Sequence, residues 1–434
     1  MNEISKLVVE TEEYDIKDAQ ARENLATLET DTRKTLGEFR ERVQGVQYKG
    51  ICAETDRWCV FDFADENKKS ILIKANTHIA LDVTKGEPRR LWFDVDKDTS
   101  FDLSEGMAEV AEGADFAVGR TFFVYIVPDG DKAKLVVSLN STFPNDVNED
   151  YTASNTRKIA WFSTMCADCG DELTGKLPVQ VGGVKNGDAY PAVPVKDEYF
   201  SAFYRKKVKL VTLGTYYDVA EVVHPLAGFK AGDIVPESVW CITFRPVANG
   251  GAMVYNPVTD TAIDIYKTSG TGAETTSEFG GLVTHSRPWR CVEGDMIAVN
   301  RRLLRDVEFT SAAMGSNVST IAAADDTDNY KVLHAGGHYD TAGRAMVSFI
   351  GIWDACGAGW EVSDDLCNYG VAIGADDGQS SFGYGANSFV SSFGGARNSA
   401  VAAIGPCARF TNAAIATAGA DRTSRGASAI VRGL

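Results

Sequence analysis

Carboxylates are the most abundant side chains in this sequence that could do chemistry, with 60 Asp and Glu among 434 residues. Two carboxylates held a few ångströms apart can hydrolyse a glycosidic bond, one as the acid and the other as base or nucleophile. Because any chain this acidic contains such pairs and most are solvated surface groups, we expect no enzymatic activity. The candidates considered for such a pair are Asp325, Asp326, Asp328, Asp340, Asp354, Asp364 and Asp365.

Cysteine and histidine offer a second chemistry, metal binding. The nine cysteines include two close pairs, Cys52 with Cys59 and Cys166 with Cys169. A structural zinc site normally needs four ligands, and the five histidines do not complete an evident set beside either pair. The sequence therefore favours buried free thiols over zinc, and an odd cysteine count excludes complete pairing within one chain.

His334, His338 and Asp340 form a third candidate cluster, since His and Asp both bind metals. The glycines between the histidines favour instead a tight turn in which His338 and Asp340 hydrogen-bond the backbone. Calcium requires several converging oxygens, and residues 374–379 are the best acidic loop for it. We expect no metal and no cofactor, although one short loop leaves a calcium ion there open.

The overall composition excludes several classes of function. With 60 acidic and 43 basic side chains the net charge is −17, whereas nucleic-acid binding requires clustered Lys and Arg. No segment approaches the roughly 20 apolar residues of a membrane span, and the acidic N-terminus does not resemble an export signal. We therefore expect a protein made in a cytoplasm, without membrane insertion or nucleic-acid partners.

The first 46 residues differ in composition from the rest of the chain. They contain no Pro, and apolar residues recur at a spacing typical of one narrow helical stripe. An isolated helix cannot bury such a stripe, so we predict a coiled coil between copies of the chain or a helix docked on a larger assembly. The alternative is a helix folded back on its own domain. The stripe consists of Leu25, Leu28, Leu36, Phe39 and Val43.

Short runs of β-branched and aromatic residues, mostly bounded by turn residues, follow this segment. They predict two β domains, at 47–145 and 146–300. One helix is expected from about 300 to 314, where apolar residues have helical spacing and Gly315 follows. The tail from 370 is rich in Gly, Ala and Ser, but its recurrent apolar residues favour a tightly turned core over disorder.

Several segments in the same order resemble a family of phage fibre proteins related to the tropism-determining adhesins of diversity-generating phages. They are YTASNTRKI (151–159), GDIVPESVW (232–240), RRLLRDVEF (301–309), GGHYDTAGR (336–344) and IGIWDACGAGWE (350–361). The tail carries a Gly-Gly-x-x-Asn step, with Ala396 and Arg397 at its variable positions, but it lacks the Trp that related tails contain.

This resemblance implies a homotrimeric virion fibre whose C-terminal domain, 301–434, has a C-type-lectin-like fold. The expected fold class is mainly β with an α+β C-terminal domain. Expected partners are other virion proteins, reached through the N-terminal helix, and a glycan or protein on the host surface. The alternative is a structural decoration or connector of the virion that binds no receptor.

If the tail contacts a receptor, its Arg, Asn and aromatic side chains are the groups suited to the task. Arg offers forked donors, and aromatic rings offer rigid apolar area. Phe393 and Phe410 have a second interpretation, as filling of the core between small residues. The predicted contact residues are Tyr384, Asn387, Phe393, Arg397, Asn398, Arg409, Phe410, Asn412, Arg422 and Arg425.

Overall fold

The fold is taken from a computed structural model of the full chain. The described residues are 6–9, 12–15, 46–47, 61–64, 67–86, 88–103, 109–110, 118–177, 183–185, 188–190, 198–201, 206–213, 220–248, 251–368, 388–400, 404–414, 416 and 418–432. Strands dominate this part of the chain, as the sequence predicted, and none of its helices is long and apolar enough to cross a membrane.

The N-terminal segment contains a short β-hairpin. Strands β1 (Lys6–Val9) and β2 (Glu12–Asp15) pair antiparallel. The prediction of a helix across 1–46 is therefore wrong for these residues, where the apolar run Leu7, Val8 and Val9 is short and rich in β-branched side chains. The apolar stripe from Leu25 to Val43 lies outside the described residues.

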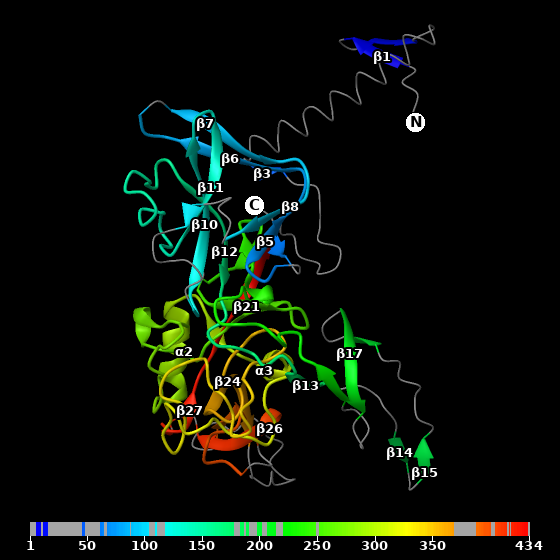
Figure 1. The fold of residues 1–434 in the computed structure, drawn as a ribbon, viewed down its shortest axis with the longest axis vertical. Coiled ribbons are helices and arrows are strands. Elements are labelled where there is room, and N and C mark those ends of the chain that lie inside the picture. The colour runs from blue at the N-terminus through cyan, green and yellow to red at the C-terminus, as the bar shows by residue number, and fades with distance from the viewer. Residues whose placement is uncertain are drawn as a thin grey trace.

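Two small sheets and a long hairpin form the upper part of the molecule in Figure 1. The long hairpin, β10 with β11, is joined by the tight turn at Gly130, whose positive φ of 58° suits glycine. All the elements of this part are antiparallel strands of the kind predicted for 47–145, apart from the parallel contact of β9 with β11. The bounds are β3 (Val46–Gln47), β4 (Phe61–Phe63), β5 (Ser70–Ile73), β6 (Thr77–Val83), β7 (Arg89–Val95), β8 (Thr99–Asp102), β9 (Glu109–Val110), β10 (Thr121–Asp129) and β11 (Lys132–Ser138).

One ten-stranded sheet extends from this upper part into the lower body. Its strand order is β21-β22-β28-β20-β19-β12-β10-β11-β9, and β23 pairs with β28. The additional bounds are β12 (Arg157–Ser163), β19 (Trp240–Cys241), β20 (Phe244–Pro246), β21 (Met253–Asn256), β22 (Thr261–Asp264), β23 (Arg302–Leu303) and β28 (Gly426–Arg432).

This sheet crosses both boundaries predicted inside the β part of the chain. Strand β10 pairs with β12 across residue 146, and β28 lies between β20 and β22, which precede residue 300. The predicted domains 47–145, 146–300 and 301–434 therefore share one sheet, although each also contains smaller sheets of its own. Local composition suggested them, whereas strand pairing is set by contacts between residues far apart in sequence.

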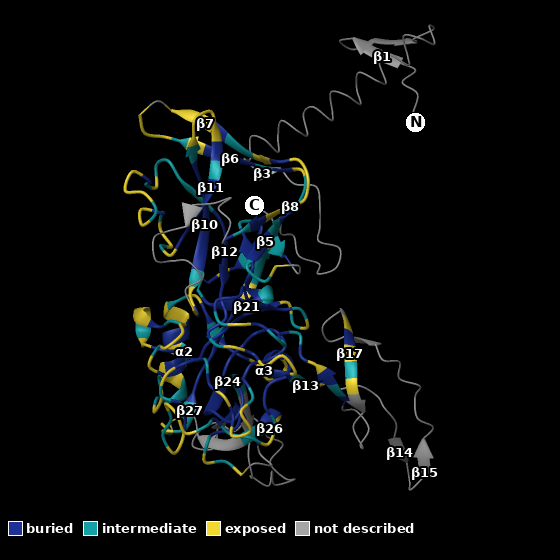
Figure 2. Ribbon diagram, viewed as in Figure 1, coloured by how far each residue is buried: buried dark blue, intermediate teal, exposed yellow. Residues whose placement is uncertain are grey.

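Two large apolar clusters form the core, and Figure 2 shows their elements as the dark interior of both parts. The upper cluster contains aromatic pairs such as Phe122 with Phe162, whose ring centroids are 5.5 Å apart. The lower cluster surrounds Trp353, which is fully buried among small residues from the Ala- and Gly-rich segments. The predicted compact core of the tail is confirmed where the tail is described, since Phe393, Ile404 and Ala427 belong to this cluster.

Two α-helices lie in the described part of the lower body, α2 (Trp289–Ala298) and α3 (Asp306–Ala313). Helix α3 confirms the second half of the helix predicted at about 300–314, whereas Arg302 and Leu303 in its first half form strand β23. The Glu308 carboxylate accepts the backbone N–H of Arg305 at 2.9 Å, which caps its first turn. The chain leaves this helix at Gly315, where φ is +86°. Helix α2 was not predicted, since its buried side chains form only a narrow stripe.

A four-stranded sheet with order β13-β18-β17-β16 projects to the side of the lower body in Figure 1. A small hairpin, β14 with β15, lies in the same stretch of chain. The bounds are β13 (Thr174–Leu177), β14 (Gly183–Lys185), β15 (Asp188–Tyr190), β16 (Glu198–Ser201), β17 (Lys206–Leu213) and β18 (Ala220–Val223), with 3-10 turns at η1 (Pro236–Ser238) and η2 (Gly272–Glu274).

Candidate functional site

A second four-stranded sheet at the base of the lower body carries half of the predicted contact residues. Its strands are β24 (Trp360–Asn368), β25 (Ser388–Gly394), β26 (Gly405–Ala414) and β27 (Arg422–Thr423), in the order β26-β25-β24-β27. The register places Ser392 opposite Phe410, Phe393 opposite Arg409 and Trp360 beside Arg422. The fold thus brings together residues more than 60 positions apart in sequence.

Phe393 is the first predicted contact residue that the structure corrects. Its ring is fully buried and stacks on Phe309 of α3, with centroids 4.9 Å apart. A side chain with no accessible surface cannot contact a receptor in this conformation. Phe393 takes the interior position because the small residues around it leave a space that only a large apolar side chain fills.

Arg409 covers this aromatic pair from the outside. Its guanidinium carbon lies 4.6 Å from the Phe393 ring centroid, and its Nε donates to Asp306 Oδ1 at 2.9 Å. Partial burial opposes ionisation of Asp306, but Arg409 stabilises the carboxylate and leaves its pKa below the usual value. Nε and Nη2 of Arg409 are therefore directed at α3, whereas Nη1 donates to the Pro406 carbonyl at 3.0 Å and the Ala408 carbonyl at 2.8 Å. The side chain thus holds β26 against the helix.

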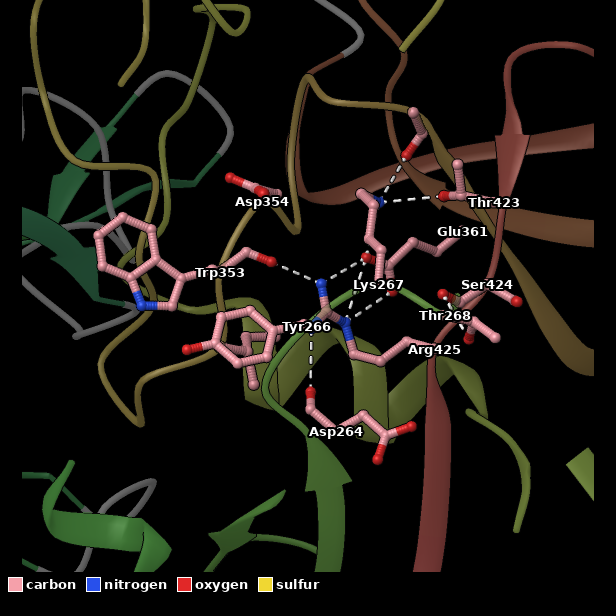
Figure 3. A network of polar contacts seen from close by, with 12 residues as sticks. Asp264, Tyr266, Lys267, Thr268, Trp353, Asp354, Glu361, Thr423, Ser424 and Arg425 are labelled. Atoms are coloured by element: carbon pink, nitrogen blue, oxygen red, sulfur yellow. Dashed lines mark hydrogen bonds and ion pairs between the residues drawn. The ribbon is translucent and has the colours of Figure 1, made fainter. Parts of the chain in front are cut away.

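Arg425 is the second correction, because its side chain is fully buried in the network drawn in Figure 3. Its Nη2 donates to Glu361 Oε1 at 2.9 Å and to the Trp353 carbonyl at 2.6 Å. Its Nη1 donates to the Asp264 carbonyl at 2.9 Å. Unpaired Arg is rarely buried, but this one gains a carboxylate from a distant strand and several carbonyls.

Lys267 completes this network from the opposite side of Glu361. Its Nζ donates to Glu361 Oε1 at 2.9 Å, to Thr423 Oγ1 at 3.1 Å and to the Gly359 carbonyl at 3.1 Å. Burial lowers the pKa of Lys267, despite the nearby carboxylate. Burial opposes ionisation of Glu361 too, but Arg425 and Lys267 outweigh it and hold its pKa below the usual value. The network ties β24, β27 and the start of β28 to the end of β22.

Sequence reasoning did not single out Lys267 or Glu361. The available signal was weak, because each is a charged residue among apolar and small residues of the types usually buried in a protein. In that setting a charge needs a partner. The identity of the partner depends on strand pairing across 94 positions, which no local pattern contains.

Arg397 and Asn398 lie on the turn that follows β25. The turn begins with Gly394 and Gly395, whose φ values of 85° and 89° are in the left-handed region. Arg397 Nε donates to the Ala322 carbonyl at 3.1 Å, and its Nη1 donates to the Asp328 carbonyl. Asn398 is exposed. The structure thus uses Arg397 to position the turn and leaves Asn398 open to solvent.

Phe410 and Arg422 are half-buried at the edge of the same sheet. The Phe410 ring lies 5.4 Å from the Trp360 ring centroid, so only part of it faces solvent. Burial lowers the pKa of Arg422, with Asp421 acting in the opposite direction. Tyr384 and Asn387 lie outside the described residues, as does the side chain of Asn412, whose backbone belongs to β26.

The candidate metal clusters take up structural roles where the chain is described. Asp340 Oδ1 accepts the backbone N–H groups of Ala342 and Arg344, both at 2.9 Å, which confirms the predicted turn at this residue. His338 Nδ1 lies 3.0 Å from Asp354 Oδ2, so the ring contacts a carboxylate rather than the predicted backbone. Cys166 and Cys169 are buried free thiols.

Across the described ranges, no three His, Cys, Asp or Glu side chains are arranged to hold a metal ion. The acidic loop at 374–379 lies outside those ranges. A groove of about 320 Å³ does open beside the sheet, between the end of β13, the turn after α3 and the start of β26. Its walls are mainly apolar, with Lys176 and Cys407 among the lining residues. The candidate site is thus a surface of sheet and turns held by buried ion pairs, with this groove beside it.

The fold of this chain is similar to the folds of several solved structures. The chain is similar to the structure titled Major Tropism Determinant U1 Variant, with a TM-score of 0.57 and 17% identity over 89% of this chain and 86% of that one. The I1 and P3c variants match with TM-scores of 0.56 at the same identity and coverage. No family model and no curated protein matches the sequence. The resemblance seen in the sequence is thus confirmed at the level of the fold.

Proposed function

We propose that this chain is the receptor-binding subunit of a bacteriophage fibre, which attaches the virion to its host. The observation that carries the proposal is the fold, shared across 89% of the chain with proteins titled as tropism determinants. A tropism determinant selects the host, and host selection requires a surface that contacts the host. The proposed function involves no catalysis and requires no metal or cofactor.

The base of the lower body suits this role physically. Buried ion pairs and aromatic stacking hold its sheet and turns, so an exposed side chain such as Asn398 is displayed from a firm frame. A rigid frame favours binding because less conformational entropy is lost on contact. Among the predicted contact residues with described side chains, Asn398 is exposed, and Phe410 and Arg422 are half-buried at the sheet edge. Arg397 and Arg409 keep some accessible surface, but their donors bind groups of the protein itself.

The remaining parts of the proposal follow from the resemblance. We propose a homotrimer in which the N-terminal segment attaches to other virion proteins and the C-terminal domain is C-type-lectin-like. The host partner is a surface glycan or protein. Three copies on each fibre, and several fibres on each particle, would add avidity to a contact that is weak in one subunit. The subunit would be made in the host cytoplasm and assembled into the virion.

Saturable binding of the purified, fluorescently labelled protein to host cells tests this function. We expect binding that unlabelled protein displaces and that a bacterium resistant to adsorption does not show. Binding that does not saturate, or that is equal on both strains, would contradict receptor recognition.

A structural decoration or connector is the second candidate, favoured by one specific observation. Phe393 and Arg425 are buried, and the donors of Arg397 and Arg409 are directed at the protein itself. A connector that binds no receptor does not need exposed side chains for receptor contact. Under this alternative the protein would fail to bind cells, and virions lacking it would be unstable or incompletely assembled.

A further inference from the structure

A tight turn between Thr327 and Val332 displays a tyrosine beside the proposed contact face. Asp328 Oδ1 accepts the backbone N–H groups of Tyr330 at 2.6 Å and of Lys331 at 2.8 Å. The Asp328 N–H donates to the Lys331 carbonyl at 3.0 Å, and Thr327 forms a β-bridge with Val332. The turn is therefore held at several points, yet Tyr330 at its tip is 44% exposed.

Arg397 joins this turn to the tail. Its backbone N–H donates to the Tyr330 carbonyl at 3.2 Å, in addition to the side-chain bonds to the Ala322 and Asp328 carbonyls. Tyr330 and Asn398 therefore lie on adjoining turns with a fixed relation to each other. Sequence reasoning missed Tyr330 because it precedes Arg397 and Asn398 by more than 60 positions.

The charged groups next to Tyr330 are paired within the chain. Asp328 binds the buried ammonium of Lys331, and Arg397 is bound to carbonyls. His285 is exposed, and its Nδ1 lies 2.8 Å from Ser286 Oγ. Partial burial, with the nearby charge of Lys331, holds the pKa of His285 below its usual value, which favours the uncharged imidazole. Among the exposed groups of these turns are the Tyr330 ring, the Asn398 amide and the His285 imidazole.

We propose that Tyr330 is a contact residue of the receptor site and that, with Asn398 and His285, it binds an uncharged saccharide of the host surface. This inference rests on the function proposed above and extends its contact face beyond the tail. A rigid aromatic ring offers apolar area that can stack on the face of a sugar ring at little cost in entropy. Amide and imidazole groups both donate and accept hydrogen bonds, as vicinal hydroxyls require.

The test is cell binding by the full-length protein carrying Tyr330→Ala. We expect the apparent affinity to fall by about tenfold or more, as for the loss of an aromatic anchor. Tyr330→Phe, which keeps the ring, should retain most of the binding. Tyr339→Ala is the matched control, because Tyr339 is 38% exposed but its hydroxyl donates to the Asp168 carbonyl at 2.8 Å. Unchanged far-ultraviolet circular dichroism and melting temperature would show that each variant is folded.

Treatment of the cells identifies the partner. Periodate, which cleaves vicinal diols, should abolish binding, whereas protease treatment should leave it. Loss of binding after protease alone would overturn the saccharide and indicate a protein receptor. Equal binding by the Tyr330→Ala variant and the unmodified protein would overturn the role of Tyr330 while leaving the proposed function intact. Absence of binding by the unmodified protein would overturn both.

Discussion

Buried charges determine how the individual residues of the lower body are held. Glu361 accepts hydrogen bonds from Lys267 and Arg425, and all three side chains are nearly or completely inaccessible. Such a network costs desolvation and is not by itself a source of stability, but removing one member leaves the others unpaired in the interior. The positions at which β24 and β28 begin therefore depend on all three side chains.

Glu361→Gln should destabilise the protein by about 3 to 5 kcal/mol, because two buried cations would lose their carboxylate. The free energy of unfolding from urea titration checks this. Glu278→Gln is the control, since Glu278 is exposed and its substitution should change stability by less than about 0.5 kcal/mol. Similar effects of the two substitutions would contradict a structural role for the network.

Because of His338, the stability of the protein should fall as the pH becomes alkaline. Burial acts to lower its pKa, but Asp354 and then Asp326 outweigh this and raise the pKa to about 9. A histidine with a raised pKa contributes stability that is full below its unfolded value of about 6.5 and is lost as the pH rises through about 9.

The stability difference between the unmodified protein and His338→Gln should therefore be on the order of 3 kcal/mol at pH 6 and should shrink by pH 10. Urea unfolding at both pH values measures it. His334→Gln is the control: His334 also pairs with Asp326, but its side chain is about half exposed, so the pair contributes little. A difference that grows with pH would contradict the assignment.

At the scale of elements, glycines set how closely the strands of the lower body approach one another. Gly394 has a φ of +85°, and a Cβ built there would lie 2.2 Å from the Ala355 carbonyl oxygen. The backbone on the other side cannot move without disturbing the core around Trp353. Glycine is therefore required at the end of β25 by both conformation and space.

Gly394→Ala should lower the free energy of unfolding by more than about 1 kcal/mol, from left-handed strain alone and further from the clash. Gly294→Ala in α2 is the matched control, because no heavy atom lies within 4 Å of a Cβ there. Alanine should stabilise that helix by up to about 1 kcal/mol. Thermal unfolding of the two variants would therefore shift in opposite directions, and a shared direction would contradict the account.

The elements that were predicted correctly are those that depend on a pattern of residues close together in the sequence. Short runs of apolar, β-branched and aromatic residues located β6 and β10, and helical spacing before a glycine located α3. Helix α2 was not predicted because its buried face contains few apolar residues, Val292 and Met296 with Asp295. Arg425 was taken as exposed, and Phe393 was left open between receptor contact and core filling. In both cases the deciding partner, Glu361 or Phe309, lies far away in sequence.

At the scale of the whole molecule, the strand nearest the C-terminus joins both parts of the fold. Strand β28 lies between β20 and β22 in the ten-stranded sheet, and Figure 1 shows it running from the lower body toward the upper part. Ala427 within it is fully buried and pairs with Ile263 on one side and Arg302 on the other. The upper and lower parts should consequently unfold together.

Ala427→Pro should cost more than about 3 kcal/mol, because proline removes a ladder donor and its ring does not fit a central strand. Hydrogen exchange followed by mass spectrometry would report on β10 in the upper part and β24 in the lower part. We expect both to lose protection in this variant. Loss confined to β24 would show that the two parts fold independently.

Competition between the purified protein and intact particles for host cells tests the receptor-binding claim most directly. The measured quantity is the adsorption rate constant of the phage at increasing concentrations of added protein. If the chain is the receptor-binding subunit, the rate constant falls with dose, and the unmodified protein inhibits at lower concentrations than the Tyr330→Ala variant. An adsorption rate that stays constant at concentrations of protein far above that of the particles would contradict the claim.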